Sequence, residues 1–194
     1  VSASVAPSWI GSTERPSADE SLPPSLQVCM RAVELRDEFG LENLHVVDRP
    51  EPELDEHGVL VRMRACSINY RDLLMVRGHY DPRQPLPLVP LSDGAGEVVA
   101  VGSQVRRFTP GDRVAGIFAQ EWISGRPTKD RIRSTLGGPL DGTLTQLRAF
   151  PDHGLVRIPD YLSYEEAATL PCAAVTAWSA MVTNAELAAG DRVL

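Results

Sequence analysis

The sequence has few cysteines, few aromatic residues, no long apolar run and no surplus of positive charge. Its three cysteines in 194 residues, Cys29, Cys66 and Cys172, are widely spaced and contain no C-x-x-C pair, which excludes a disulfide framework. No apolar run approaches the roughly 20 residues that a membrane-spanning helix needs. The net charge of −7 argues against nucleic acid or an anionic membrane as a partner, because both favour surplus Lys and Arg. A reducing cytoplasm is therefore the expected location.

A further absence concerns nucleotide binding. No G-x-G-x-x-G run occurs anywhere, although a Gly190-Asp191 turn near the end of the chain leads into an apolar stretch. In a dinucleotide-binding fold, the glycine-rich phosphate loop follows such a strand. The sequence therefore predicts the first part of a two-domain enzyme, with substrate-side groups but without most of a cofactor site.

Residues 1–29 differ in composition from the rest of the chain. They are rich in Ser, Pro and Ala and show no apolar periodicity, so they cannot repay the entropy of ordering. Three acidic residues against a single arginine argue against a mitochondrial presequence, and no apolar segment suits secretion. We predict a disordered leader, with the folded part beginning at Met30.

Residues 30–160 contain short strand-like segments separated by Gly, Pro and Asp. The expected strands are 32–35, 44–47, 59–65, 96–102, 113–118 and 154–159. Many short strands with turns between them favour a mainly β fold, either a barrel or a sandwich.

Residues 161–194 change to a helical pattern. Ser163 and Glu166 have the spacing of a capping box, which predicts a short Ala-rich helix that breaks near Pro171. A second helix is expected over 173–182, followed by a strand after the Gly190-Asp191 turn. Two helices and a strand are the entry to an α/β domain, so we predict a domain boundary at about residue 160.

Two polar clusters could carry chemistry. The first, 67–72, places an amide, a phenol, a guanidinium and a carboxylate directly after an apolar strand, where working residues often lie. Asn69 and Asp72 could equally do no more than cap the helix that begins there. The second cluster, 90–97, surrounds Asp93 with small residues. That pattern suits close approach to a ligand and, as an alternative, a tight turn into a strand.

These clusters and several other motifs carry a family resemblance. They are Ser67-Ile68-Asn69-Tyr70-Arg71-Asp72-Leu73-Leu74, Pro90-Leu91-Ser92-Asp93-Gly94-Ala95-Gly96-Glu97-Val98, Thr109-Pro110-Gly111-Asp112-Arg113-Val114, Asp141-Gly142-Thr143-Leu144, Glu165-Glu166-Ala167-Ala168-Thr169-Leu170-Pro171-Cys172 and Thr176-Ala177-Trp178. From residue 30 onward the chain resembles the N-terminal part of the medium-chain dehydrogenase/reductase superfamily, the zinc-type alcohol dehydrogenases and quinone oxidoreductases. Trp122 and the run 136–139 make it most similar to a zinc-free NAD(P)-dependent alcohol dehydrogenase subgroup.

The resemblance implies a GroES-like, partly open β-barrel followed by the first helices and strand of a truncated α/β Rossmann domain, with the active site between them. It also implies that no zinc is bound. In zinc-dependent relatives a cysteine stands where this chain has Asn69, a histidine stands where it has Ser92, and the neighbouring acid is Asp93. Only Cys172 falls on a ligand position, which is too few for a three-ligand site.

The implied reaction is hydride transfer between NAD(P)(H) and a small-molecule carbonyl, quinone or enone. Without a Lewis acid, the developing oxyanion needs hydrogen-bond donors. Tyr70 is the best donor, Asn69 would orient the substrate or the nicotinamide ribose, and Asp72 and Asp93 complete the expected catalytic set. Thr176 falls where a hydroxyl faces the nicotinamide carboxamide, which makes Asn69, Tyr70 and Thr176 the expected cofactor contacts.

Each of these residues also has a purely structural interpretation. Thr176 could be an ordinary residue at the edge of the core, Asp93 could hold its turn, and Cys172 could be a small buried apolar residue. The resemblance implies that the cofactor is bound mainly by the Rossmann domain. We therefore expect the 194 residues alone to be inactive and to bind NAD(P)H weakly.

Two rivals to this interpretation stay open at the level of sequence. One is a non-catalytic GroES-like β-barrel that serves as an interaction module. The other is the enoyl-reductase module of a larger synthase, which shares the Asn-x-Arg-Asp pattern found at 69–72. Oligomeric state in the superfamily rests on the Rossmann domain, which allows a homodimer for a full-length enzyme.

Overall fold

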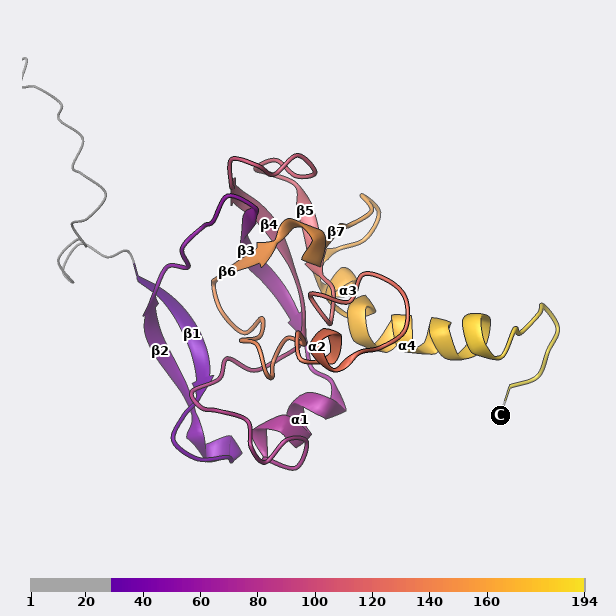
Figure 1. The fold of residues 1–194 in the computed structure, drawn as a ribbon, viewed down its shortest axis with the longest axis horizontal. Coiled ribbons are helices and arrows are strands. Elements are labelled where there is room, and N and C mark those ends of the chain that lie inside the picture. Colours follow the sequence, from indigo (N-terminus) through magenta and orange to yellow (C-terminus); the bar gives the residue numbers. More distant parts are fainter. Residues whose placement is uncertain (1–28, 194) are drawn as a thin grey trace, which may run out of the picture.

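The computed structural model describes residues 29–193 as two antiparallel sheets with a few short helices (Figure 1). The predicted leader, apart from Cys29, lies outside the described residues. The smaller sheet pairs β1 (Cys29–Leu35) with β2 (Leu44–Pro50). The larger sheet has the order β6-β3-β4-β5-β7 and contains β3 (Gly58–Ser67), β4 (Asp93–Val101), β5 (Arg113–Gly116), β6 (Leu147–Pro151) and β7 (Leu155–Arg157).

The two sheets do not join into one closed ladder among the described strands. Instead, β1 bonds to loops: the Val33 N–H donates to the Leu144 carbonyl at 3.0 Å, and the Leu35 N–H donates to the Leu88 carbonyl at 2.8 Å. The mainly β, partly open GroES-like architecture expected from the sequence is confirmed. Strand β6 was not expected, and its sequence Leu-Arg-Ala-Phe-Pro gives only a weak alternation.

The main core lies between the strands of the larger sheet and the loops that cover it. Its buried residues are Val59, Val61, Val98, Val105, Phe108, Val114, Leu136, Phe150 and Leu155. In β3 the side chains alternate, so that Val59 and Val61 are buried while Arg62 is exposed. This period of two explains why 59–65 was recognised as a strand.

A close backbone approach positions the loop that precedes β6. The Gly142 N–H donates to the Val89 carbonyl at 2.7 Å, and the Thr143 N–H donates to the Leu91 carbonyl at 2.9 Å. A Cβ atom on Gly142 would lie 2.1 Å from the Leu91 oxygen and 2.2 Å from the Pro90 oxygen. Only glycine fits here, and the contact fixes the chain immediately before Asp93.

Three short helices begin at polar N-cap residues, of which those of α1 and α3 were expected. In α1 (Tyr70–Val76) the N-cap is Asn69, in α2 (Lys129–Ile132) it is Thr128, and in α3 (Tyr164–Ala168) it is Ser163. Short 3₁₀ turns, η2 (Leu41–Asn43) and η3 (Asp152–Gly154), precede β2 and β7.

The capping box of α3 is present as predicted. The Glu166 N–H donates to the Ser163 hydroxyl at 3.1 Å, and the Ser163 N–H donates to the Glu166 carboxylate at 2.8 Å. Ala167 and Ala168 share a buried cluster with Ala95 and Ala115, and α3 lies directly against β3 and β4. Small side chains let this helix approach the sheet closely.

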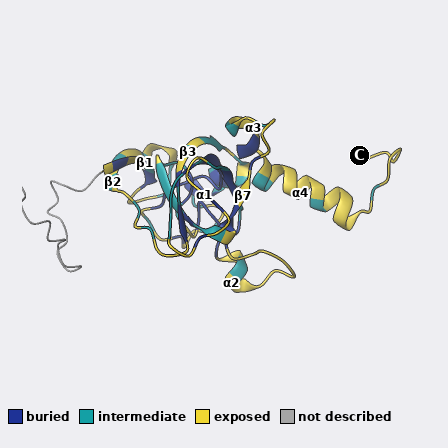
Figure 2. Ribbon diagram, turned by 90° about the horizontal axis from the view of Figure 1, so that it is seen from above, coloured by how far each residue is buried: buried dark blue, intermediate teal, exposed yellow. Residues whose placement is uncertain are grey.

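A longer helix follows α3 and projects from the body of the molecule (Figures 1 and 2). It consists of a π-helical segment η4 (Leu170–Ala174), α4 (Val175–Trp178) and a second π-helical segment η5 (Ser179–Asn184). We call residues 170–184 the projecting helix. The predicted break near Pro171 is confirmed, since α3 ends at Ala168 and a second helix begins at Leu170. The predicted start at residue 173 is three residues late, because proline is tolerated in the first turn of a helix.

The strand expected after the Gly190-Asp191 turn is absent from the described residues 191–193. A strand is defined by a ladder to a neighbour, and no described strand lies beside this segment. The predicted domain boundary near residue 160 stays a prediction. Among residues 29–193, no helix combines the length and apolar character needed to cross a membrane.

Candidate functional site

A buried carboxylate joins the sheet to the projecting helix. Asp93, the first residue of β4, is fully buried. One of its oxygens accepts the Ser92 hydroxyl at 3.0 Å, and the other accepts the backbone N–H of Cys172 at 3.0 Å. Ala167 and Ala168 of α3 pack on the same strand and bring the start of the projecting helix within reach.

A second buried carboxylate lies on the other side of Ser92. Asp72 accepts the Asn69 N–H at 2.7 Å, which caps α1, and its other oxygen accepts the Ser92 N–H at 3.2 Å. The Asn69 amide nitrogen lies 3.5 Å from the Ser92 hydroxyl oxygen. Hydrogen bonds thus connect Asn69, Asp72, Ser92, Asp93 and Cys172, a set that we call the polar network.

Burial shifts the ionisation of this network. Desolvation raises the pKa of both Asp72 and Asp93 above their ordinary range, and the hydrogen bonds donated by Asn69 oppose that rise. Burial, followed by the charges of Asp93 and Asp72, raises the pKa of the Cys172 thiol. At neutral pH the thiol is therefore protonated and a poor nucleophile.

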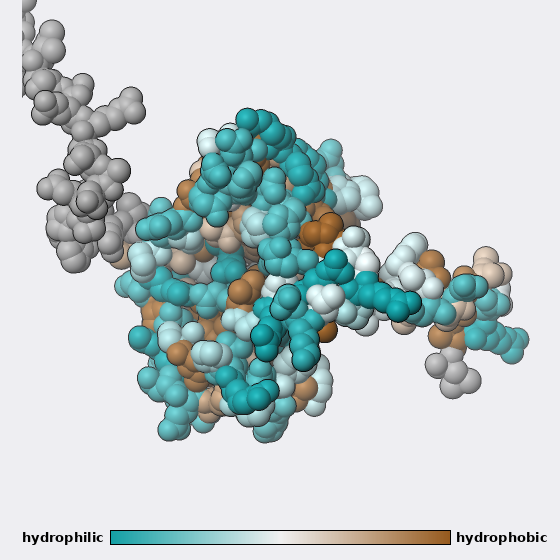
Figure 3. Space-filling model, in the orientation of Figure 1, coloured by the Kyte–Doolittle hydropathy of each residue, from teal (hydrophilic) through white to brown (hydrophobic). Residues whose placement is uncertain are grey.

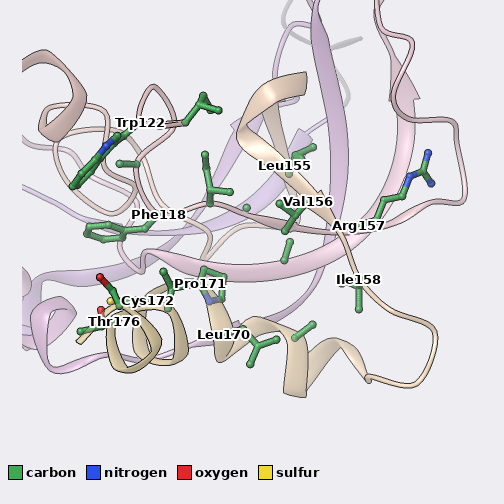
Figure 4. A pocket seen from close by; sticks show the side chains of 18 of the residues that line it. Phe118, Trp122, Leu155, Val156, Arg157, Ile158, Leu170, Pro171, Cys172 and Thr176 are labelled. Carbon is green, nitrogen blue, oxygen red and sulfur yellow. The ribbon is translucent and has the colours of Figure 1, made fainter. Parts of the chain in front are cut away.

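A cavity of about 1010 Å³ opens beside the polar network. Figure 4 shows two facing walls. The sheet-side wall contains Phe118, Trp122, Leu155 and Val156, and the helix-side wall contains Leu170, Pro171, Cys172 and Thr176. Figure 3 shows apolar surface beside the base of the projecting helix. The cavity is mostly apolar, with few polar groups to orient a ligand, which is typical of a small-molecule site.

The structure brings some of the predicted site residues together and leaves others apart. Asn69, Asp72 and Asp93 meet in the polar network. Thr176 is exposed on α4 and lines the cavity. Tyr70 is 75% exposed at the start of α1, next to Asn69 in the chain but outside the cavity walls.

Three residues at the site were not among those predicted for it. Ser92 links the two carboxylates, Phe118 forms a cavity wall, and the Thr143 hydroxyl donates to the Asp93 carbonyl at 2.9 Å. Ser92 could have been found, because it directly precedes Asp93 in a recognised motif. Phe118 ends an apolar strand segment, and no local signal separates it from a core residue.

The donor set of this chain does not fit a zinc ion. The oxygens of Asp72 and Asp93 already accept N–H and O–H donors, and the groups beside them, at Asn69 and Ser92, are an amide and a hydroxyl. Zinc prefers a thiolate, imidazole nitrogen or unengaged carboxylate. Within residues 29–193, no group of three or more His, Cys, Asp or Glu residues could hold a metal.

Comparison with known proteins locates the chain in a family. Residues 55–160, which include β3 to β7 and α1, match the alcohol dehydrogenase GroES-like domain. A zinc-type alcohol dehydrogenase-like protein of Schizosaccharomyces pombe is 43% identical over 148 residues, covering 76% of this chain and 43% of that protein. A polyketide synthase of Streptomyces halstedii, GfsB, is 37% identical over 141 residues, covering 73% of this chain and 2% of the synthase.

A solved structure agrees with these sequence matches. A putative alcohol dehydrogenase from Sinorhizobium meliloti superposes with a TM-score of 0.76 at 40% identity, covering 84% of this chain and 49% of that one. The chain thus spans less than half of the length of these two dehydrogenase relatives. Together with the polar network and the apolar cavity, the matches show that the chain belongs to the medium-chain dehydrogenase/reductase superfamily, through its alcohol dehydrogenase GroES-like domain.

Proposed function

We propose that the protein containing these residues is a zinc-independent oxidoreductase, which transfers hydride between NAD(P)(H) and a small carbonyl, quinone or enone. The polar network is the observation that supports this proposal best. By the family resemblance, its positions 69, 92, 93 and 172 are those that hold the metal in zinc-dependent relatives. Here they bond to one another instead, beside an apolar cavity.

The cavity suits the nicotinamide end of the cofactor, which supplies the hydride when it is bound. The Thr176 hydroxyl is exposed on the helix-side wall, where it can hydrogen-bond a carboxamide. The apolar residues of both walls can exclude water from the reacting atoms. We propose that Thr176, Asn69 and Tyr70 contact the cofactor, and that this chain holds only that end of it.

Tyr70 is the proposed proton donor to the developing oxyanion. Tyr70 is exposed and directly follows Asn69 in the chain, so we propose that its phenol reaches a ligand held next to the polar network. The Asn69 backbone is fixed by Asp72 and its amide nitrogen lies next to Ser92, so we propose that the same amide also orients that ligand. We propose that Asp72 and Asp93 act by holding Asn69, Ser92 and the start of the projecting helix.

The test is NADH and NADPH oxidation by the natural gene product, with aldehydes, quinones and enones as acceptors and a chelator present. We expect chelator-resistant turnover, and a fall in kcat of about 100-fold in Tyr70→Phe, the lower end for loss of a general acid. Tyr161→Phe, at an 83% exposed tyrosine outside the cavity walls, is the matched control and should leave kcat unchanged. Turnover abolished by the chelator, or a fully active Tyr70→Phe, would contradict the proposal.

A second candidate is favoured by the similarity to the polyketide synthase: an enoyl-reductase module acting on a thioester carried by a larger synthase. Turnover of an enoyl thioester in preference to a free enone of equal chain length would support it. Absence of NAD(P)H binding in the folded natural protein would instead favour the non-catalytic interaction module.

A further inference from the structure

Arg71 is the one residue of the 69–72 motif that the proposed chemistry does not use, and its surroundings are unusual for an arginine. It lies at the second position of α1, and its side chain is only 10% exposed. Its nearest carboxylate oxygen, on Asp72, is 3.9 Å from Nη1, at the limit of an ion pair. Backbone carbonyls take most of its hydrogen bonds instead.

These carbonyls belong to one loop. Nη1 donates to the Leu136 carbonyl at 3.0 Å, Nη2 donates to the Gly138 carbonyl, and Nη2 also lies 3.4 Å from the Thr135 hydroxyl oxygen. The planar guanidinium can make these contacts simultaneously, which a lysine ammonium cannot reproduce. Arg71 therefore joins α1 to residues 135–138, more than 60 positions further along the chain.

The flat faces of the same guanidinium contact two aromatic rings. Its central carbon lies 4.8 Å from the centroid of Tyr80 and 5.0 Å from that of Phe118, both within the range of a cation–π contact. Phe118 forms part of the sheet-side wall of the cavity and lies across from Cys172 and Thr176 in Figure 4. The Phe118 carbonyl also accepts the Leu136 N–H at 3.0 Å, so Arg71 holds this residue through its ring and through its backbone neighbour.

Stability alone does not account for this arrangement. Nε of Arg71 is buried and has no hydrogen-bond partner among the described residues. A buried donor without an acceptor is unfavourable, and an apolar side chain of similar volume often serves a core as well or better. The contacts of Arg71 instead converge on one wall of the cavity.

We propose that Arg71 is a positioning residue that fixes Phe118 and so sets the width of the cavity between Phe118 and the helix-side wall. This inference rests on the proposed function. A fixed Phe118 ring limits the space beside it, which favours small carbonyl substrates over those with an aromatic substituent near the reacting carbon. Without the Arg71 guanidinium, Phe118 loses its stacking partner and residues 135–138 lose the hydrogen bonds that hold them. The Phe118 ring can then move aside, so the cavity accepts bulkier substrates.

The experiment compares a small enone, methyl vinyl ketone, with a bulky one, benzylideneacetone, in the natural protein with NADPH or NADH. If the protein prefers saturated ketones, butanone and acetophenone replace them. We expect the ratio of kcat/KM for the small substrate to that for the bulky one to fall about tenfold in Arg71→Met, which is within the range for a change of hydrophobic pocket size. The same ratio for Arg71→Lys should lie between the values for wild type and Arg71→Met.

Arg148→Met is the matched control. Arg148 also stacks on a phenylalanine, with its central carbon 5.6 Å from the Phe150 ring, and its Nε is likewise buried without a partner among the described residues. It lies in β6, outside the cavity walls. This variant should change the stability of the protein but leave the substrate ratio at its wild-type value.

Phe118→Leu keeps the hydrogen bonds of Arg71 and guards against misfolding of the Arg71 variants. It should reproduce the fall in the substrate ratio. If Arg71→Met folds and is active but keeps the ratio within twofold of wild type, the inference is wrong while the proposed function stands. If Arg148→Met shifts the ratio as much as Arg71→Met, the effect is general loosening and the inference is also wrong. Wild-type protein without NAD(P)H turnover would overturn the proposed function, and the inference with it.

Discussion

Replacing Asp93 with alanine should both destabilise the protein and release the projecting helix. Asp93 is fully buried and accepts two hydrogen bonds, from the Ser92 hydroxyl and the Cys172 N–H. In Asp93→Ala both donors lose their acceptor in a site that water does not fill easily. The polar network holds the first turn of the projecting helix through the hydrogen bond from the Cys172 N–H. Local opening of this helix should therefore become more frequent than unfolding of the whole protein.

The expected size follows from the number of donors left without an acceptor. Each buried donor left unpaired costs about 1–3 kcal/mol. Cys172 is only half-buried and can recover part of its loss with water, so we expect a total of about 2–4 kcal/mol for Asp93→Ala. In Asp93→Asn the amide oxygen can accept the Cys172 N–H while the amide nitrogen donates to the Ser92 oxygen, so the loss should be about 1 kcal/mol.

Two measurements check this expectation. Urea unfolding followed by circular dichroism gives the free energy of unfolding of wild type, Asp93→Ala and Asp93→Asn. Hydrogen exchange of the amides of 172–178 reports the opening of the projecting helix. The reasoning is refuted if Asp93→Ala unfolds within about 0.5 kcal/mol of wild type, or if those amides exchange at the wild-type rate in the alanine variant.

Four further expectations concern ionisation, packing and metal binding. Burial raises the pKa of Asp72 and Asp93, so the folded protein binds more protons than the unfolded chain. The free energy of unfolding should therefore fall as pH rises from about 3.9, the unfolded value, through the folded pKa. Urea titrations from acid to neutral pH should show a smaller fall in Asp93→Asn. Gly142→Ala places a Cβ 2.1 Å from a carbonyl oxygen and should cost about 3 kcal/mol or prevent folding, whereas Gly111→Ala, with φ +94° and open space, should cost about 1 kcal/mol in the same assay. At neutral pH, iodoacetamide should alkylate the Cys172 thiol more slowly than it alkylates the thiol of glutathione, because burial and then the charge of Asp93 raise the pKa of Cys172. Alkylation of Cys172 should be faster in Asp93→Asn, and mass spectrometry of the peptide measures both rates. Neither equimolar zinc nor a chelator should change the melting temperature, because only a metal that binds the folded state would raise it.

The caps and strands of this protein were predictable because they depend on residues close together in the chain. Asn69 and Asp72 are three positions apart, as are Ser163 and Glu166, and each pair caps a helix as its spacing indicates. The capping interpretation of Asn69 and Asp72 did not compete with a place at the site: the same Asp72 carboxylate that caps α1 also binds Ser92. One side chain with two oxygens serves both purposes.

The expectations that failed depend on neighbours that sequence does not reveal. The predicted break near Pro171 is confirmed, but the second helix starts at Leu170 rather than 173, because Pro171 fits its first turn. Strand β6 was missed because its own residues alternate only weakly. It forms by hydrogen bonding to β3, which precedes it by more than 80 positions. A strand was expected after the Gly190-Asp191 turn, yet the described residues 191–193 have no strand partner.

The amino-acid sequence alone determined the family, the mainly β architecture and the identities of the polar residues, because all of these depend on residue type and local spacing. Only the tertiary structure decided that Asp93 bonds to the backbone of Cys172, 79 positions away, and that Arg71 clamps a loop and a ring at one wall of a cavity. Such contacts arise where β4, α1 and the projecting helix converge. They depend on strand register and helix placement across long stretches of chain, which local residue preferences do not specify.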